Sequence, residues 1–589
     1  EDGLKDYEDG KKEFDEQISD AEQKIADAKQ ELADLKKPEL YVLTRDTNAG
    51  YVSFESDSTI VEKLSGLFPI FFFLIAALVC STTMTRMIDD ERTQIGTLRA
   101  LGYSRGSILA KYLLYSGSAA ALGCVIGYFA GGYVFPFVIW TAYGMLYSIP
   151  GFVILYDPVL FVIALAASLL CSAGTTYLAL RIEMQNMPAN LIRPKTPAAG
   201  KRIFLERITP LWKRLKFLHK VSLRNIFRFK KRMIMMILGI AGCTALVLTG
   251  FGIHDSVANI ANFQFDDIQK YDVSAQFSDT LTEDKINEVE SDHKSELDAA
   301  TAVQMTSGDV TGDSITKSAY IVASDDPAIT DIFDLHIDGE TVPYPGKGEV
   351  LLTEKLAELT DIKTGDTVTV SVSDTEKAEL KVAGLVENYV QNYLYMTGET
   401  YAMVADKGYE PKTLLLRVND SADEYALSAA LSKTDGVSSV SVVTDTRNMI
   451  DQMMQSLNYV VALVLISAGA LAFIVLFNLG NINLTERVRE IATIKVLGFH
   501  SGETGAYVFR ENIILSMMGI VVGLPLGVLL HTFVLMQIRV DMVSFKAVIA
   551  PVSFLLTVVM VVLFTVITDL VMRKKIAKID MAESLKSIE

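Results

Sequence analysis

The stretch Gln94-Ile-Gly-Thr-Leu-Arg-Ala-Leu-Gly-Tyr103 occurs again, slightly altered, as Glu490-Ile-Ala-Thr-Ile-Lys-Val-Leu-Gly-Phe499, which lies 396 residues further along the chain. In both copies a ladder of glycines, one at every fourth residue, follows without a gap in the alignment. The ladder residues are Gly123, Gly127 and Gly131 in the first copy and Gly519, Gly523 and Gly527 in the second. Two unrelated apolar helices would not keep both features in register. The chain therefore contains an internal repeat.

The repeated motif predicts a short amphipathic helix, because its apolar and basic residues fall on different faces. Gly102 and Gly498 suit the turn that ends such a helix. Presented twice on the inner surface, the helix suits docking to two identical partners, and a helix lying on the lipid surface is the alternative. The candidate docking residues are Arg92, Gln94, Ile95, Leu98, Arg99, Leu101, Gly102, Tyr103, Glu490, Ile491, Ile494, Lys495, Leu497, Gly498 and Phe499. The six ladder glycines are expected to allow close helix packing.

Around these motifs lie long uncharged blocks, and half of the 589 residues are hydrophobic. A helix needs about 20 apolar residues to cross the hydrocarbon core of a bilayer. Seven blocks can each hold one span, the second as a helix to about Trp140 followed by an interfacial loop to Tyr156. The blocks are Leu64–Thr85, Tyr112–Tyr156, Pro158–Leu180, Met233–Ile253, Gln452–Thr485, Asn512–Ile538 and Ala547–Thr568. The four cysteines all lie inside them and are expected to act as small apolar residues.

Charge distribution predicts the orientation of the spans, because cytoplasmic loops carry an excess of lysine and arginine. The loops at 86–111, 181–232, 486–510 and 573–589 are basic. On the other side, residues 1–63 have 18 acidic and 9 basic residues, a net charge of −9, and residues 254–456 have 38 and 14, a net charge of −24. Because the whole chain has −17, the remainder carries +16. Solvation of two exposed domains explains the acidic excess.

The two acidic segments have different predicted structures. Residues 1–37 carry an apolar heptad seam that predicts an extracytoplasmic coiled coil ending at Pro38, a solitary charged helix being the alternative. Residues 38–63 read as a polar connector with strand-like pieces at Tyr41–Leu43 and Tyr51–Phe54. Since residue 1 is Glu, we expect the chain to be a fragment or a mature product.

The segment 254–456 alternates strand and helix patterns and predicts an extracytoplasmic α/β domain. We expect its helices at about 283–299 and 354–360. The predicted strands are Tyr271–Phe277, Gly348–Thr353, Thr367–Val372, Lys381–Val386, Tyr401–Val404, Thr413–Val418 and Val437–Val443. The fold class is thus a polytopic α-helical membrane protein that carries an α/β domain and an N-terminal coiled coil.

Motifs of catalysis are missing from the sequence. The G-x-x-x-x-G-K-[ST] phosphate loop does not occur, so no ATPase is assigned to this chain, and H-E-x-x-H is absent as well. The six histidines are scattered and offer no metal spacing. We therefore predict no catalytic residue, no metal and no cofactor in this chain, and no nucleic-acid partner. Asp569, Arg510 and Glu511, near the inner ends of two spans, are expected to pair locally, a proton relay being the alternative.

Several motifs resemble the FtsX-like permeases of the MacB type, also called type VII ABC transporters. The two repeated loops are similar to the family pattern R-E-I-G-x-L-R-A-L-G. Val221–Arg232 resembles the segment that leads into a permease half, and Gly348–Val372 resembles the extracytoplasmic domain. Pro188–Leu191 and Ala582–Leu585, after the last span of each half, match as well. The coiled coil is similar to that of large two-module members from Gram-positive bacteria.

The resemblance implies two permease modules of four spans each, the first lacking its first span here. It also implies a bacterial plasma-membrane location, a dimer of separate ATPase subunits that bind ATP and Mg, and coupling helices at 91–105 and 487–501 seated in those subunits. The implied domains are 1–37 coiled coil, 38–63 connector, 64–193 first module with coupling loop 86–111, 194–232 linker and amphipathic helix, 233–253 span, 254–456 outer domain, and 457–589 second module with coupling loop 486–510.

Two functions fit these expectations. The first is a mechanotransmitting permease, which passes ATP-driven closure of its partners through the spans to export or extract an amphipathic peptide or lipid. The second is a transmembrane regulator whose coiled coil binds and activates an extracytoplasmic partner, for example a cell-wall hydrolase. Contacts with membrane lipid are expected in both. An enzyme is not expected.

Overall fold

The computed structural model describes most of the chain and divides it into two compact units, Glu1–Glu55 and Ser56–Glu589. The described residues are 3, 10–12, 14, 18–25, 29, 45, 49–148, 151–192, 217–228, 230–312, 315–373, 376–406, 408–485, 488–498, 501–538 and 543–577. Within 1–37 these residues are helical, but most of the predicted coiled coil lies outside them, so the coiled coil stays a prediction. Phe499, Ala582–Leu585 and most of the 194–232 linker also lie outside.

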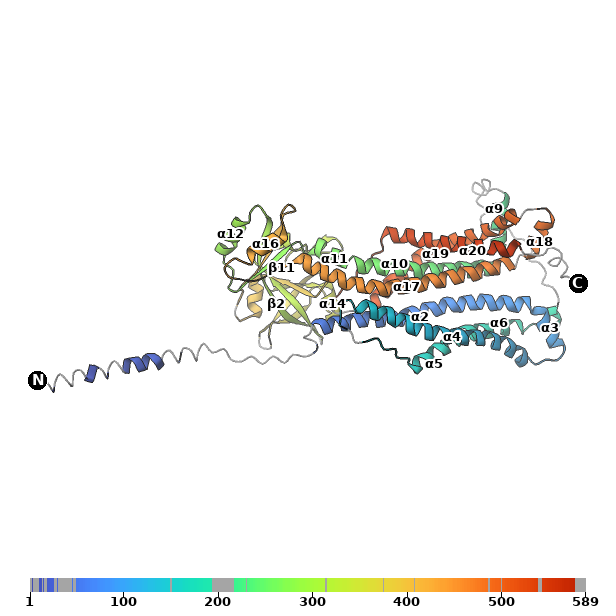
Figure 1. Cartoon of the computed structure of the whole chain (residues 1–589), viewed down its shortest axis with the longest axis horizontal. Helices are drawn as coiled ribbons and strands as arrows, with labels where there is room; N and C mark the ends of the chain where they lie inside the picture. The colour runs from blue at the N-terminus through green and yellow to red at the C-terminus, as the bar shows by residue number, and fades with distance from the viewer. Residues whose placement is uncertain are drawn as a thin grey trace. The chain divides into compact units, whose positions relative to one another are not determined.

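Long helices dominate both halves of the repeat (Figure 1). The first half contains α2 Ala49–Asp90, α3 Arg92–Ala100, α4 Arg105–Tyr143, α5 Pro158–Leu169, the π-helix η2 Leu170–Gly174, α6 Thr175–Glu183 and α7 Pro188–Ile192. The second contains α9 Phe217–Arg228, α10 Lys230–Ala258, α11 Ile260–Asn262, the π-helix η4 Phe263–Ile268, α17 Val443–Thr485, α18 Val488–Val496, α19 Ser501–Gln537 and α20 Pro551–Ala577. In the described residues seven helices are long and apolar enough to cross a membrane, as predicted.

The connector before the first span differs from its prediction. Tyr51–Phe54 is not a strand but belongs to α2, which begins at Ala49. A lone strand would leave its backbone groups without partners, whereas a helix that continues the span satisfies them within itself. The other long block follows its prediction: α4 ends at Tyr143, and the described residues from there to Asp157 are not helical.

The predicted α/β domain is present between α10 and α17. Its helices are α12 Glu283–Asp292, α13 Ile329–Ile332, α14 Glu354–Thr360, α15 Gly398–Val404 and α16 Glu424–Leu431. Its strands are β1 Val273–Phe277, β2 Leu297–Thr311, β3 Thr316–Ala323, β4 His336–Ile337, β5 Glu340–Thr341, β6 Glu349–Thr353, β7 Thr367–Ser371, β8 Lys377–Val386, β9 Tyr393–Met396, β10 Thr413–Val418 and β11 Val437–Val442.

The long strand β2 joins two parts of the domain. One part is a closed circuit in the order β2-β3-β9-β6-β8-β7, which returns to β2 because β7 pairs with both β8 and β2. The other part is an open sheet in the order β11-β1-β10-β2. Closure removes free strand edges from the first part. Fully buried Val310, Leu352 and Val370 fill the circuit, while Val273, Leu414 and Leu431 lie in the core of the open sheet.

Two local predictions in this domain were wrong. Tyr401–Val404 is not a strand but the end of helix α15, because Thr397 caps that helix by accepting a hydrogen bond from the Thr400 N–H at 3.2 Å. The helix predicted over 283–299 ends at Asp292, and Leu297 already begins β2. The sequence reading also missed strands β2, β3 and β9, although they form the centre of the sheet.

The outer domain connects to the spans without flexible linkers on either side. Strand β11 ends at Val442 and α17 begins at Val443, so the 43-residue helix leads directly from the sheet to Thr485. On the other side α10 leads through α11 and η4 into β1. Helices α10 and α17 pack against each other and run side by side in Figure 1.

Candidate functional site

The first repeated motif forms helix α3, which packs against α7 at the same end of the molecule. Following the charge prediction, we call this end the inner end. Ile95 is fully buried, and a Cβ at Gly96 would lie 2.9 Å from Cγ1 of Ile192 and 3.0 Å from Cβ of Leu191. The small residue thus allows α7 to lie directly on α3. In the second copy Ile491 is likewise fully buried.

The basic residue at the equivalent position of each motif contacts the last span of its own half. Arg99 Nη1 donates to the carbonyl oxygens of Met184 at 3.0 Å and Asn186 at 2.5 Å, just beyond α6. Lys495 Nζ donates to the carbonyl of Ile576 at 2.7 Å, near the end of α20. Carbonyls at a helix C-terminus have no partner within the helix, and a cation there is favourable. The repeat therefore ties each short helix to a span.

Arg92 has a similar structural role, since its Nε lies 2.7 Å from Oε1 of Glu183 in α6. The sequence reading expected these basic side chains to face a partner. In the structure Arg92, Arg99 and Lys495 instead contact the chain itself, because the ends of the spans provide acceptors and a carboxylate within reach.

We expect Arg99→Met to loosen α3 from the first half, because two charge-assisted hydrogen bonds disappear. A cost of about 1–2 kcal/mol is reasonable for partly solvated bonds of this kind. Backbone amides in α3 should then exchange hydrogen faster with solvent. The control is Arg105→Met, which removes an exposed arginine that starts α4. If the α3 amides exchanged hydrogen at the same rate in both variants, the Arg99 hydrogen bonds would not be what holds α3 in place.

Leu101 and Leu497 follow the two helices as exposed tips. Gly102 and Gly498 have φ values of +91° and +94°, a conformation that favours glycine. In the first copy Gly102 N donates to Arg99 O and Tyr103 N donates to Leu98 O, which is the Schellman pattern. This turn leaves both leucines 71 % exposed. Ile95 and Ile491 are buried, so the apolar surface available to a partner is at the turn.

The other candidate residues of the motifs lie around this tip. Tyr103 is exposed, and Leu98, Ile494 and Lys495 are half-buried. Gln94 is exposed and its Oε1 accepts a hydrogen bond from Lys111 Nζ at 3.3 Å. Nothing is described for the Glu490 side chain or for Phe499.

A small polar cluster joins the start of α3 to α4. Glu91 accepts a hydrogen bond from the Tyr112 hydroxyl at 2.6 Å and forms an ion pair with Lys111 at 3.1 Å. The hydrogen bond from Tyr112 is the main cause that lowers the pKa of Glu91, and the contact with Lys111 adds to it. The carboxylate therefore stays charged and holds the hinge between α2 and α3 against the next span.

The two glycine ladders have different surroundings. In α19 a Cβ at Gly519 would lie 2.6 Å from Ile240, and at Gly523 it would lie 2.6 Å from Thr244, both residues of α10. Gly527 faces Leu248 and Ala245 of the same helix. In α4, by contrast, no described atom lies within 4 Å of a Cβ built at Gly123 or Gly127, and Gly131 meets only Phe135 of its own helix. Only the second ladder packs a helix among the described residues.

The two halves of the repeat contact each other through α2 and α17, at residues that occupy the same position in each copy. Arg86 of α2 donates to the carbonyl of Ile482 of α17 at 3.2 Å, and these residues are 396 apart, the offset of the repeat. Close by, Asn478 Nδ2 donates to Thr83 Oγ1 at 2.9 Å. Contact between equivalent positions indicates that a pseudo-twofold axis passes between α2 and α17.

At the far end of the spans, the loop between α19 and α20 is fastened to the outer domain. Lys546 Nζ lies 2.8 Å from Oε2 of the buried Glu387, which also accepts from the Tyr389 hydroxyl and, at 2.8 Å, from the Asp338 N–H. Burial opposes ionisation of Glu387, but these hydrogen bonds outweigh it and lower its pKa. Backbone bonds add to the junction, because Ser544 N donates to Tyr389 O at 2.9 Å.

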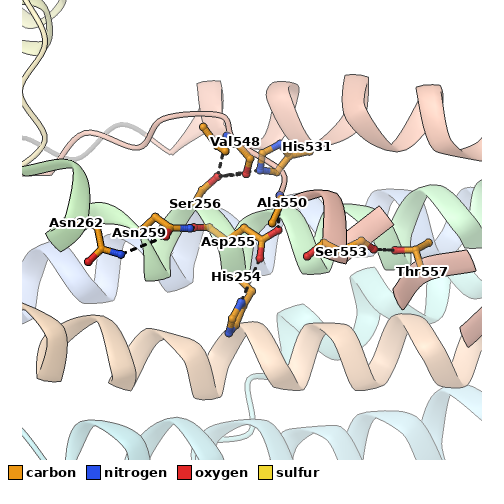
Figure 2. Close-up of polar contacts among 10 residues, drawn as sticks. All are labelled: His254, Asp255, Ser256, Asn259, Asn262, His531, Val548, Ala550, Ser553 and Thr557. Atoms are coloured by element: carbon orange, nitrogen blue, oxygen red, sulfur yellow. Dashed lines mark hydrogen bonds and ion pairs between the residues drawn. The ribbon is translucent and has the colours of Figure 1, made fainter. Parts of the chain in front are cut away.

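The same loop is also bound to the outer end of α10, as Figure 2 shows. Ser256 Oγ donates to Val548 O at 3.2 Å and lies 3.2 Å from His531 Nε2 of α19. Asp255 Oδ2 accepts from the Ala550 N–H at 2.9 Å. Sequence reasoning missed this junction, since its residues come from three distant segments and share no motif.

A further tie joins α17 to η4. Arg447, in the first turns of α17, lies 2.6 Å from Oδ1 of Asp266, and its Nη2 donates to Asn262 Oδ1 at 2.7 Å. Helices α17 and η4 each connect a span to the sheet. The Arg447–Asp266 ion pair therefore holds these two connecting segments together.

Family models match both the membrane-spanning halves of the chain and the α/β domain. A model described as FtsX-like permease C-terminal matches residues 66–184 and, a second time, residues 462–581, so it covers both halves of the repeat. A model described as MacB-like periplasmic core domain matches residues 233–434, which hold α10 and the α/β domain up to strand β11. This chain is an FtsX-like, MacB-type ABC transporter permease. As the sequence predicted, the permease is a multi-pass plasma membrane protein.

Permeases of these families work with ABC ATPase partners. No curated protein matches the permease. Among solved structures, the extracellular domain of the noncanonic ABC-type transporter YknZ from Gram-positive bacteria has 14 % identity and a TM-score of 0.22, covering 29 % of this chain and 98 % of its own. The periplasmic region of MacB from Actinobacillus actinomycetemcomitans has 14 % identity and a TM-score of 0.22, covering 31 % and 94 %.

Proposed function

We propose that this permease is a mechanotransmitter, which couples ATP hydrolysis by a dimer of separate ATPase subunits to movement of its outer domain. The observation that carries the proposal is the unbroken helix α17, which leads from β11 to the inner end and stops three residues before α18. A push on α18 is transmitted along this helix, because a hydrogen-bonded α-helix resists compression and bending along its length. ATP and Mg are bound by the partner subunits, and this chain contributes no catalytic group.

The coupling surface consists of the exposed Leu101 and Leu497 tips with their adjoining glycine turns. Each tip belongs to a short helix whose basic residue is bonded to the last span of its half, through Arg99 or Lys495. Displacement of a tip therefore moves two spans at once, one that precedes the short helix and one that ends beside it. Without these hydrogen bonds the short helices would rotate relative to the spans, and movement of a tip would not be transmitted to the spans.

The far end receives this motion at the junction around Glu387. The loop that carries Lys546 follows α19 in the chain and is bonded to α10 and to the outer domain. Ser256 of α10 also lies 3.2 Å from His531 of α19. A shift of α19 against α20 therefore pulls on Glu387 and Tyr389. Few polar groups line the spans, which disfavours a hydrophilic channel. A pull on the outer face suits export or extraction of an amphipathic peptide or lipid.

The test follows hydrogen exchange in the outer domain of the permease assembled with its ATPase. ATP addition should change exchange at η4 and at residues 543–550, and a hydrolysis-deficient ATPase should arrest that change in one state. If ATP is hydrolysed at the full rate while the outer domain shows no change, the mechanotransmission proposal fails.

A pH experiment tests the Glu387–Lys546 contact. Since the folded pKa of Glu387 is lowered below its ordinary 4.5, the contact stabilises the protein above that pH and loses its effect as pH falls through the folded pKa. We expect Lys546→Met to lower the thermal stability at pH 7, with a deficit that shrinks as the pH falls through the folded pKa of Glu387. The control Lys347→Met removes an exposed lysine paired with Glu399. A deficit that stays constant as the pH falls would point to lost packing instead.

A regulator that activates an extracytoplasmic partner is the second candidate. It is favoured by the N-terminal heptad seam, in which Phe14, Ile18 and Ile25 are all exposed in a helical backbone. Deletion of residues 1–37 distinguishes the two functions. Loss of partner activation with intact export would favour the regulator, whereas unchanged function of both kinds would remove its support.

A further inference from the structure

Helices α10, α17, α19 and α20 line a small, partly open cavity within the inner half of the second module. Its volume is about 20 Å³, enough for one water molecule or one small ion. Five polar side chains from α19 and α20 line it, namely Asn512, Ser516, Thr565, Thr568 and Asp569. The remaining lining is apolar and comes from α10 and α17, with Gly480 of α17 leaving room for the polar groups. Such a concentration of oxygen atoms inside an apolar bundle needs an explanation.

Two of the hydrogen bonds at the cavity form a chain that ends on the Asp569 carboxylate. Asn483 Nδ2 donates to Asn512 Oδ1 at 2.6 Å, and Asn512 Nδ2 donates to Asp569 Oδ1 at 2.8 Å. Thr565 Oγ1 donates to Ser516 Oγ at 3.1 Å. Thr568 is only 2 % exposed, and its Oγ1 has no hydrogen-bond partner. Among the described residues, the cavity thus holds a buried hydroxyl that lacks a partner, close to a carboxylate.

The charge of Asp569 is not neutralised by an ion pair in the described part of the chain. Asp569 is only 8 % exposed. Arg573, one turn further along α20, attracts the Asp569 carboxylate but is itself exposed to solvent. Burying an isolated carboxylate in an apolar bundle is costly, so the carboxylate requires a bound cation or a proton.

We propose that this cavity binds one Na⁺ ion, held by Asp569 together with the hydroxyls of Thr568, Ser516 and Thr565. One carboxylate balances one positive charge, and hydroxyl and carboxylate oxygens are hard donors that suit such an ion. No group of three or more His, Cys, Asp or Glu side chains in the described part of the chain could hold a metal ion, so a divalent site is not formed here.

The site occurs in one half of the repeat alone. At the offset of 396, Ser116 and Ala120 stand where the second half has Asn512 and Ser516, and Met84 stands where it has Gly480. Met84 is buried, and its side chain is larger than the hydrogen atom of Gly480. Because the ion bridges α19 and α20, it holds together the two helices whose loop carries Lys546. This inference goes beyond the proposed function and does not depend on it.

The test measures thermal unfolding of the purified permease in lipid nanodiscs, without any ATPase. NaCl replaces N-methyl-glucamine chloride at constant ionic strength and pH 7.5. We expect the wild-type Tm to rise and saturate, by about 3 °C in total. Asp569→Asn should abolish the rise, and Thr568→Val, which keeps the side-chain shape, should shift the saturation to at least tenfold higher Na⁺.

The matched control is Asp57→Asn, which changes another buried carboxylate that accepts the Tyr147 hydroxyl at 2.9 Å. This variant should keep the full Na⁺ response. Three outcomes would overturn the proposal: a wild type that does not respond to Na⁺, a response that survives both site variants, or a rise produced equally by acidification without Na⁺, which would mean that Asp569 takes a proton. The Thr568→Val variant decides the matter should Asp569→Asn fail to fold.

Discussion

The double variant Leu101→Asp with Leu497→Asp is expected to abolish association of the permease with its ATPase. Both leucines are 71 % exposed, so the free permease loses little when they become charged. Burial of a leucine in a partner contributes about 2 kcal/mol, which corresponds to about thirtyfold in affinity for each tip. Copurification and the stimulated ATPase rate measure the effect, and each single variant should show an intermediate loss.

The control for this prediction is Met403→Asp, since Met403 is also exposed but lies in α15 of the outer domain. It should leave ATPase binding unchanged. If the double variant still binds its ATPase with wild-type affinity, the two tips are not the docking surface. The alternative noted from the sequence, helices that lie on lipid, would then gain support.

The second large effect is expected in the glycine ladders. Gly523→Leu should destabilise the second module by about 3 kcal/mol or more, because the added Cβ would lie 2.6 Å from Thr244 Cβ and 2.8 Å from the Ala241 carbonyl. Helices α10 and α19 would have to separate along their contact. A fall in Tm and faster proteolysis of the detergent-solubilised permease are the measurements.

The repeat itself supplies the matched control. Gly127→Leu changes the equivalent ladder residue of α4, where no described atom lies within 4 Å of the added Cβ, so its Tm should stay within about 1 °C of the wild type. Equal losses in the two variants would show that Gly127 also packs a helix. If neither variant lowered the Tm, helices α10 and α19 would be able to move apart at little energetic cost.

The sequence predicted the membrane class and the repeat well, because both depend on patterns within a continuous stretch. A span is recognised from its own apolar length, and the two motifs are recognised from their register with the glycines that follow. The outer domain was harder. The predicted strand Thr367–Val372 is rich in β-branched residues and was recognised, whereas the long β2 contains Gly308 and polar residues and was missed.

Identical motifs also received different roles from their surroundings. Gly123 and Gly519 occupy the same place in the repeat, yet only Gly519 contacts another helix, because α10 lies against α19. Arg99 and Lys495 looked like docking residues, but each is bonded to a helix end some 80 residues away in sequence. Such contacts depend on where distant helices lie, which a local pattern does not encode.

The sequence by itself determined the seven spans, the paired motifs and the presence of an α/β domain, because each follows from hydrophobicity or periodicity along one segment. The orientation of the spans is a prediction from charge. Only the tertiary structure decided the Glu387–Lys546 junction, the cavity at Asp569 and the exposure of Leu101. Each of these depends on the meeting of segments far apart in the chain. The physical reason is that burial, charge compensation and steric fit are properties of neighbours in space.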